Sequence, residues 1–139
     1  MPMSLKERQR LVSSWLKLQR TPEIGVERED LSWVVEKVWD LCDEAPNDAF
    51  EFILAVLDRD ASDATMALLC AGPLEALLRR HGPRIISRVE RRARRDAVFV
   101  RLLGHVWKDA LSTQIWTRVQ HIRERHRARD VADKATAAG

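Results

Sequence analysis

The sequence predicts an all-α protein, and three observations support that fold class. Apolar residues recur with helical spacing in nearly every segment, no segment alternates as a half-buried strand does, and glycine, proline and capping residues interrupt the chain at short intervals. A chain of 139 residues can bury one core. We expect a compact array of about eight short helices in antiparallel hairpins, either an orthogonal bundle or a short solenoid-like stack. The domain is expected over residues 1–126, with a frayed tail over 127–139 where the apolar pattern fades.

The first half of the chain predicts four helices. The first has a capping-box pattern, Ser4 with Glu7, and is expected to end before the breakers Pro22 and Gly25. The second is expected to end at about Glu44, before a proline. The four helices are expected to begin at Ser4, at about Arg28, at Asn47 or Asp48, and at about Asp63.

The stretch AGPLEALLRRHGPR holds two Gly-Pro pairs and predicts two helix boundaries. Gly72 is expected to adopt the left-handed conformation that closes one helix, and Pro73 suits the first turn of the next. Gly82 and Pro83 repeat the pattern. We therefore expect this stretch to form tight turns between short antiparallel helices.

The second half predicts further helices over about 83–95, over about 96–108 and from Ser112 onward. Trp107 and Trp116 fall on the apolar stripes of these helices, as Trp15 does in the first helix, so we expect all three in the core. Trp33 and Trp39 lie near the edge of the second helix's stripe. An edge tryptophan is a candidate interface anchor, with packing against a neighbouring helix as the alternative.

Charge is divided unevenly along the chain. Residues 1–70 carry 8 Lys and Arg against 14 Asp and Glu, a net of −6, whereas residues 71–139 carry 16 against 7, a net of +9. Arginine, the main cation of the second half, pairs bidentately with carboxylates and phosphates. The asymmetry predicts either a charged partner surface or pairing between the two halves.

The strongest candidate site is an arginine stripe within residues 84–95. Helical spacing places Arg84, Arg88, Arg91 and Arg95 on one side of a helix, opposite an apolar side. The stripe suits an acidic protein surface or a row of phosphates. A solvated face whose arginines pair within the chain explains it as well. If nucleic acid is the partner, the expected contacts are Arg88, Arg91, Arg92 and Arg118, using the stripe and the helix from 112.

A second candidate is an acidic and aromatic patch around the end of the second helix. Trp39, Asp40, Asp43 and Glu44 form it, and together they suit a basic partner. A solvated turn with helix caps explains the same residues equally well.

The segment LSTQIWTRV is superficially similar to the recognition helix of a helix-turn-helix, whose polar side chains enter the major groove. Three positions do not fit. Ala110 stands where the tight turn usually has glycine, and Trp116 stands where a small aliphatic residue usually packs. Val106 stands where the preceding helix normally has a small residue. A plain terminal hairpin with a charged outer face is the preferred interpretation.

No pattern in the sequence points to catalysis, a metal or a cofactor. The four histidines lack the i, i+4 spacing of metal ligands, and no P-loop, GxGxxG or nucleophile motif is present. Cys42 and Cys70 lie in apolar helical contexts and predict buried thiols in a reducing cytoplasm rather than a disulfide. No apolar run approaches the roughly 18 residues of a membrane span, and the N-terminus lacks a signal-peptide core. We expect a cytoplasmic protein that is not an enzyme.

Several motifs between Leu31 and Val119 resemble a family of small bacterial helical proteins of unknown function. The shared marks are Gly72-Pro73-Leu74-Glu75, His81-Gly82, Leu102-Leu103-Gly104, Trp107 and Trp116. The resemblance implies a bacterial, all-helical, single-domain protein and supplies no catalytic residues.

These observations predict a small non-catalytic interaction domain of the immunity, inhibitor or adaptor kind. It is expected to bind a protein partner through its charged surfaces. Nucleic-acid binding is the alternative, a homodimer is compatible with the sequence, and no membrane partner is expected.

Overall fold

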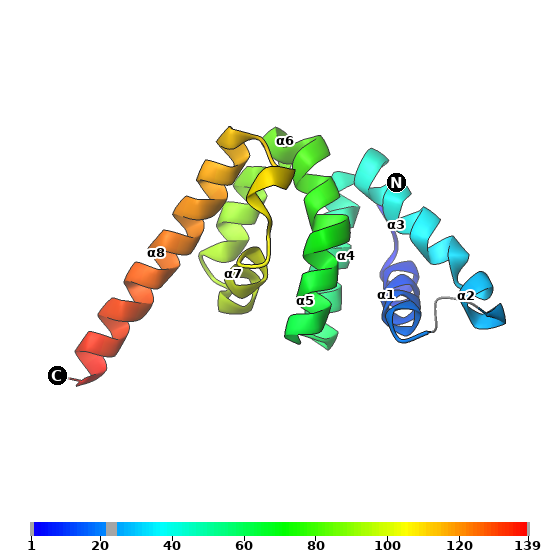
Figure 1. The fold of residues 1–139 in the computed structure, drawn as a ribbon, viewed down its shortest axis with the longest axis horizontal. Helices are drawn as coiled ribbons and strands as arrows, with labels where there is room; N and C mark the ends of the chain where they lie inside the picture. Colours follow the sequence, from blue (N-terminus) through cyan, green and yellow to red (C-terminus); the bar gives the residue numbers. More distant parts are fainter. Residues whose placement is uncertain (1, 22–24, 139) are drawn as a thin grey trace.

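The computed structural model describes residues 2–21 and 25–138, with side chains as far as Thr136. These residues form helices and no strand, which confirms the all-α class. In Figure 1 the helices stand side by side in an arched row, from α2 and α3 at one end to α8 at the other. The helices are α1 (Leu5–Gln19), α2 (Val26–Asp30), α3 (Ser32–Glu44), α4 (Pro46–Arg59), α5 (Asp63–Leu69), α6 (Glu75–Ala93), α7 (Ala97–Leu103) and α8 (Thr113–Ala138).

Two of the predicted helix starts are confirmed by hydrogen bonds. The Ser4 hydroxyl accepts from the Glu7 backbone N–H (3.1 Å), and the Ser112 hydroxyl accepts from that of Ile115 (3.3 Å), so each serine caps its helix. The expected cap of α4 is wrong. That helix begins with a proline, whose missing N–H needs no partner, and Asp48 instead accepts from the Met3 N–H (3.2 Å).

The expected second helix is divided. α2 and α3 meet at Leu31, which breaks the helical pattern between them. Gly25 is one of the two helix breakers predicted to follow the first helix. It precedes α2 and has a φ of +144°, a conformation that favours glycine. The other breaker, Pro22, lies outside the described residues.

The predicted boundary at Gly72 and Pro73 is wrong. A π-helical turn over Cys70–Leu74 joins α5 to α6 without interruption, and Gly72 does not adopt a left-handed conformation. Pro73 has no backbone N–H to donate and lies inside this π turn, a kind of single-turn insertion that occurs within α-helices. Both Pro73 and Leu74 are buried there, so packing holds the turn in place.

The second Gly-Pro pair does mark a bend, although it is not built as expected. His81 has φ −126° and ψ 20°, outside the helical range, so α6 consists of two arms that meet at this residue. Gly82 has no positive φ, so it does not close a helix in the left-handed conformation. Its role is close packing, because a Cβ at this position would lie 2.8 Å from two side-chain carbons of Ile115 in α8.

α7 is shorter than its predicted range, and this exposes a tryptophan that was expected in the core. The helix ends at Leu103, and Trp107 lies in an extended conformation before a 3-10 turn over Lys108–Ala110. Its side chain is 72% exposed because helical spacing no longer applies there. Trp15 is buried and Trp116 is half-buried against the core, as expected.

The C-terminal residues also differ from the expected frayed tail. α8 continues to Ala138, and a salt bridge from Lys134 to Asp130 one turn earlier (3.2 Å) supports the helical conformation. The apolar pattern fades after Arg127 because no described side chain in this part of α8 is buried in the core. Every described side chain from that residue onward is exposed.

One core joins both halves of the chain. Phe50 of α4 meets Phe99 of α7 edge to face, with ring centroids 5.6 Å apart. The two cysteines are free and buried, as predicted. Burial raises the pKa of Cys42 to about 11 and that of Cys70 to about 12, and the Cys70 thiol donates to the Leu102 carbonyl (3.1 Å).

Candidate functional site

Arg84, Arg88 and Arg91 of the predicted arginine stripe lie on the second arm of α6, whereas Arg95 lies in the turn after it, because the helix ends at Ala93 and not at residue 95 as expected. The four residues differ in their surroundings. Arg88 is half-buried and bound within the chain. Its guanidinium pairs with the Glu51 carboxylate of α4, donates to the Asn47 side-chain oxygen (3.2 Å) and lies 4.8 Å from the centre of the Phe50 ring. Pairing between the acidic and basic halves of the chain therefore accounts for this arginine.

The other three stripe residues, Arg84, Arg91 and Arg95, are exposed. Within residues 2–21 and 25–138, none of them forms an ion pair. Their neighbour Arg92 is held by Asp96, with Nε 2.9 Å from the carboxylate. Two fixed arginines, Arg88 and Arg92, therefore lie beside three exposed arginines that form no ion pair among the described residues.

A groove of about 280 Å³ lies between α4 and the C-terminal part of α6, and we call it the arginine groove. Arg88, Arg91 and Arg92 of α6 and Arg95 of the following turn form one side, and Arg84 is not part of it. Phe50, Glu51 and Leu54 form its α4 side, so one carboxylate and two apolar side chains face four guanidinium-bearing residues. The single carboxylate is already taken by Arg88 and lies 3.6 Å from Arg8. The groove therefore has an excess of positive charge.

The predicted acidic and aromatic patch is exposed but is not uniform. Asp43 forms an ion pair with Arg80, and its backbone carbonyl meets the His81 ring nitrogen Nε2 at 2.9 Å. Asp40 and Glu44 are exposed, with no ion pair among the described residues. Trp39 is 42% exposed. These contacts tie α3 to the bend of α6, so Asp43 stabilises the fold.

Trp39 lines a different feature, a shallow apolar groove across α1, α3 and α5. The exposed apolar side chains Val35 and Leu68 lie in the same groove. The sequence predicted Trp39 at the edge of its helix's apolar stripe, but it gave no sign that Leu68 would lie near it. The two residues come together only because α5 packs against the rest of the fold.

The helix-turn-helix interpretation does not fit the structure. α7 and α8 are joined by the nine residues Gly104–Ser112, far more than the three or four of that motif's tight turn. Arg118, named for nucleic-acid contact, is bound by Glu90 of α6 through its guanidinium (Nε to Oε2 3.4 Å). This pair joins α8 to α6.

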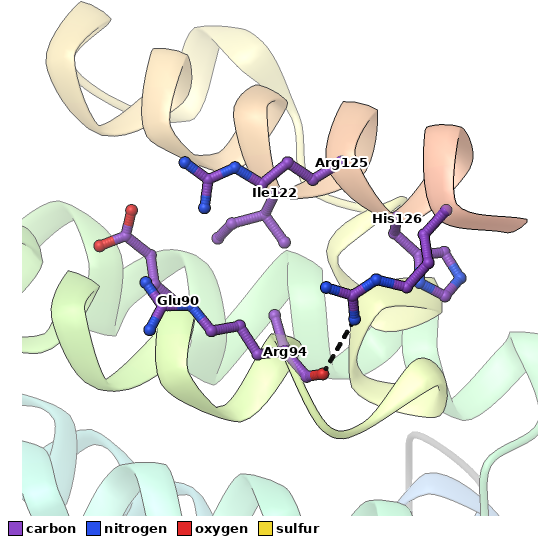
Figure 2. Close-up of a pocket in the computed structure, with 7 residues that line it drawn as sticks. Glu90, Arg94, Ile122, Arg125 and His126 are labelled. Carbon is purple, nitrogen blue, oxygen red and sulfur yellow. Dashed lines mark hydrogen bonds between the residues drawn. The ribbon is translucent and has the colours of Figure 1, made fainter. Parts of the chain in front are cut away.

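A second basic feature, which the sequence did not predict, lies on the other side of α6. Figure 2 shows this cleft between the end of α6, with Glu90 and Arg94, and the middle of α8, with Ile122, Arg125 and His126. Arg129 spans it and donates to the Arg94 backbone carbonyl (3.4 Å). We call it the α6–α8 cleft; its seven lining residues are Glu90, Ala93, Arg94, Ile122, Arg125, His126 and Arg129.

A helical signal in the sequence could have located the α8 side of this cleft. Ile122, Arg125, His126 and Arg129 follow the spacing i, i+3, i+4, i+7, which places them on one face of a helix. A search for apolar residues at helical spacing misses this face, because three of its four residues are polar.

Two classes of site are not found among residues 2–21 and 25–138. No group of three or more His, Cys, Asp and Glu side chains is arranged to hold a metal ion. No helix in the same ranges is both long and apolar enough to cross a membrane.

The fold and these surfaces define a small all-α protein with two basic depressions on either side of one helix. The chain belongs to the family described as "Family of unknown function (DUF6869)", which matches residues 21–127. The resemblance noted over Leu31–Val119 is therefore confirmed at the level of a family of unknown function. Neither a curated protein nor a solved structure matches the chain significantly.

Proposed function

We propose that the protein is a non-catalytic binding module that recognises an acidic surface of another protein through the arginine groove. The observation that carries the proposal is the unbalanced charge of this groove. Arg91 and Arg95 have no acidic partner within the described residues, while Arg88 and Arg92 beside them are held by Glu51 and Asp96. Fixed arginines lower the entropy lost when a ligand binds.

The mixed lining of the groove favours a protein over a polyphosphate. Phe50, Leu54 and Glu51 lie among the arginines. A nucleic-acid backbone is uniformly anionic and gains nothing from a carboxylate in the wall. A protein surface carries acidic, apolar and basic side chains together and can complement all three.

Nucleic-acid binding remains the second candidate function, and one observation favours it. Between residues 113 and 129, α8 carries five arginines against one glutamate. Together with the exposed arginines of α6, they give an extended basic surface. Binding of this kind weakens steeply as salt is raised, because counterions are released from the phosphates.

The test is affinity capture from a lysate of the source organism by three purified chains. The first is the native chain and the second is Arg91→Glu with Arg95→Glu. The matched control is Lys6→Glu with Lys37→Glu, which makes the same change in formal net charge, from +3 to −1, outside the groove. Lysates are used with and without nuclease, and captured proteins are quantified by mass spectrometry.

We expect a nuclease-resistant partner whose recovery falls at least about tenfold with the groove variant and less than twofold with the control. Equal recovery by both variants would refute the role of the arginine groove. Recovery that vanishes with nuclease would favour the second candidate.

The thiols support a cytoplasmic location for this module. Cys42 and Cys70 are free and buried, which suits a reducing compartment. Cell fractionation with an antibody against the chain tests this, and recovery in an extracellular or periplasmic fraction would contradict it.

A further inference from the structure

The α6–α8 cleft combines an apolar floor with a cationic rim. Its floor is formed by Ala93 and Ile122, each only 8% exposed. Arg94, Arg125, Arg129 and His126 also line the cleft, together with Glu90. The enclosed volume is about 100 Å³, which suits one small group rather than an extended chain.

Two acceptor groups at the cleft, the Glu90 carboxylate and the Arg94 backbone carbonyl, are already bound by other arginines. Arg118 binds the Glu90 carboxylate from outside the cleft, through both Nε and a terminal nitrogen. Arg129 donates to the Arg94 carbonyl, one of the oxygens that the end of α6 leaves without a helical partner. Within residues 2–21 and 25–138, Arg94 and Arg125 form no ion pair. Two guanidinium groups are therefore available to an anion.

Arginine and an apolar floor together specify a ligand with two parts. A guanidinium offers parallel N–H donors that match the two oxygens of a carboxylate. Ile122 and Ala93 favour an aliphatic group beside that carboxylate, because burying apolar surface is favourable. A carboxylate alone would leave Ile122 and Ala93 uncovered, and an aliphatic group alone would leave the arginines without an anion.

We propose that the α6–α8 cleft binds a peptide segment in which a carboxylate lies next to an aliphatic side chain. The proposal rests on the proposed function, since it names the chemistry of one contact made by the acidic protein partner. Arg94 and Arg125 bind the carboxylate, and the aliphatic side chain packs on Ile122. The cleft is thus a second contact, separated from the arginine groove by the second arm of α6.

The experiment titrates four defined probes into the full isotope-labelled chain at pH 7, followed by NMR. N-acetyl-leucine carries both the carboxylate and the aliphatic group, acetate carries only the first, and N-acetyl-leucinamide carries only the second. Phenyl phosphate tests whether a phosphate replaces the carboxylate. The signals observed are the Ile122 methyl groups and the Arg94 and Arg125 side-chain N–H groups.

We expect N-acetyl-leucine to shift these signals with a Kd on the order of millimolar, as befits a fragment of its size. Acetate and N-acetyl-leucinamide are each expected to bind at least about tenfold more weakly. Equal binding of acetate and N-acetyl-leucine would overturn the apolar part of the proposal. Tighter binding of phenyl phosphate would overturn the carboxylate assignment.

Two matched variants complete the test. Arg125→Gln is expected to weaken N-acetyl-leucine about tenfold, because a charge-assisted hydrogen bond is lost. Arg127→Gln makes the same change on the same helix at an exposed residue outside the cleft, and is expected to change the Kd less than twofold. Arg94→Gln repeats the first result independently. Unchanged binding by both cleft variants would overturn the proposal.

This titration uses no natural partner, so its failure is distinguishable from failure of the proposed function. Loss of probe binding with retained sensitivity to Arg91→Glu and Arg95→Glu would overturn only the cleft. The reverse result would overturn only the arginine groove.

Discussion

Gly82 gives the sharpest test of how α6 and α8 are held together. Substitution by alanine places a Cβ 2.8 Å from Cγ1 and Cδ1 of Ile115, a side chain that is 5% exposed and enclosed by the core. Overpacking of this kind costs about 1–3 kcal/mol. Alanine also lowers the entropy of the unfolded chain and regains about 0.4–1 kcal/mol, because the backbone here has no positive φ. The midpoints of the two ranges give a net expectation for Gly82→Ala of a loss of about 1.3 kcal/mol in the free energy of unfolding.

The assay is urea unfolding of the native chain and three variants, Gly82→Ala, Ile115→Val and the double variant. Ile115→Val removes Cδ1, one of the two carbons that alanine would meet, and by itself costs about 0.5–1.5 kcal/mol. The double variant is expected to be more stable than the sum of the two changes predicts, by at least about 0.5 kcal/mol. The slope of the free energy of unfolding against urea concentration should stay unchanged, so that the variants differ only in the midpoint of unfolding.

Two outcomes would refute the reasoning about Gly82. The first is a Gly82→Ala chain as stable as the native one or more stable. The second is strict additivity in the double variant, which would mean that residue 82 and Ile115 do not compete for space. In thermal unfolding, each kcal/mol should correspond to roughly 3–5 °C for a chain of this length.

Three further predictions concern other contacts. The native chain should resist a thiol reagent at pH 8, because burial raises the pKa of Cys42 to about 11 and that of Cys70 to about 12; absorbance should show both thiols reacting only after unfolding. Hydrogen bonds from the Ser62 backbone N–H, and from the Ser62 and Thr65 side chains, lower the pKa of Asp60. The ionised Asp60 therefore stabilises the fold fully above the ordinary aspartate pKa, and this stabilisation is lost as the pH falls through the lowered pKa. Asp60→Asn should therefore reduce the urea midpoint at pH 7 and have less effect at pH 3; an equal effect at both pH values would contradict this. Alanine substitutions of Arg88 and Glu51 should show a coupling of about 0.5–1 kcal/mol in a double-mutant cycle, and zero coupling would mean that the pair is not formed in solution.

The features that the sequence predicted correctly are local. Ser4 and Ser112 cap their helices because the cap and the bonded N–H lie only three residues apart. The face of α6 that carries Arg84, Arg88 and Arg91 follows from helical spacing alone. The free, buried state of the cysteines follows from their apolar neighbours.

The features that the sequence could not give depend on distant segments. A Gly-Pro pair has the same local preferences in a turn and in a π-helical turn, and only the packing of Pro73 and Leu74 decides between them. Arg88 pairs with Glu51 across 37 positions, so no local pattern separates it from the exposed Arg91. The α6–α8 cleft exists only because two helices meet there, with Gly82 allowing their close approach.

The interlocking of the two halves has a consequence for synthesis of the chain. The apolar face of α4 is buried only when α6 and α7 are present, because Arg88 of α6 lies over the Phe50 ring and Phe99 of α7 packs against the same ring. At about 5–20 residues per second, the ribosome takes roughly 2–7 s to add residues 71–103, which include α6 and α7. For that time the nascent first half exposes an apolar face. Mutual repulsion from its net charge of −6 keeps unfinished chains apart, before Asp43 and Glu51 pair with arginines of the second half.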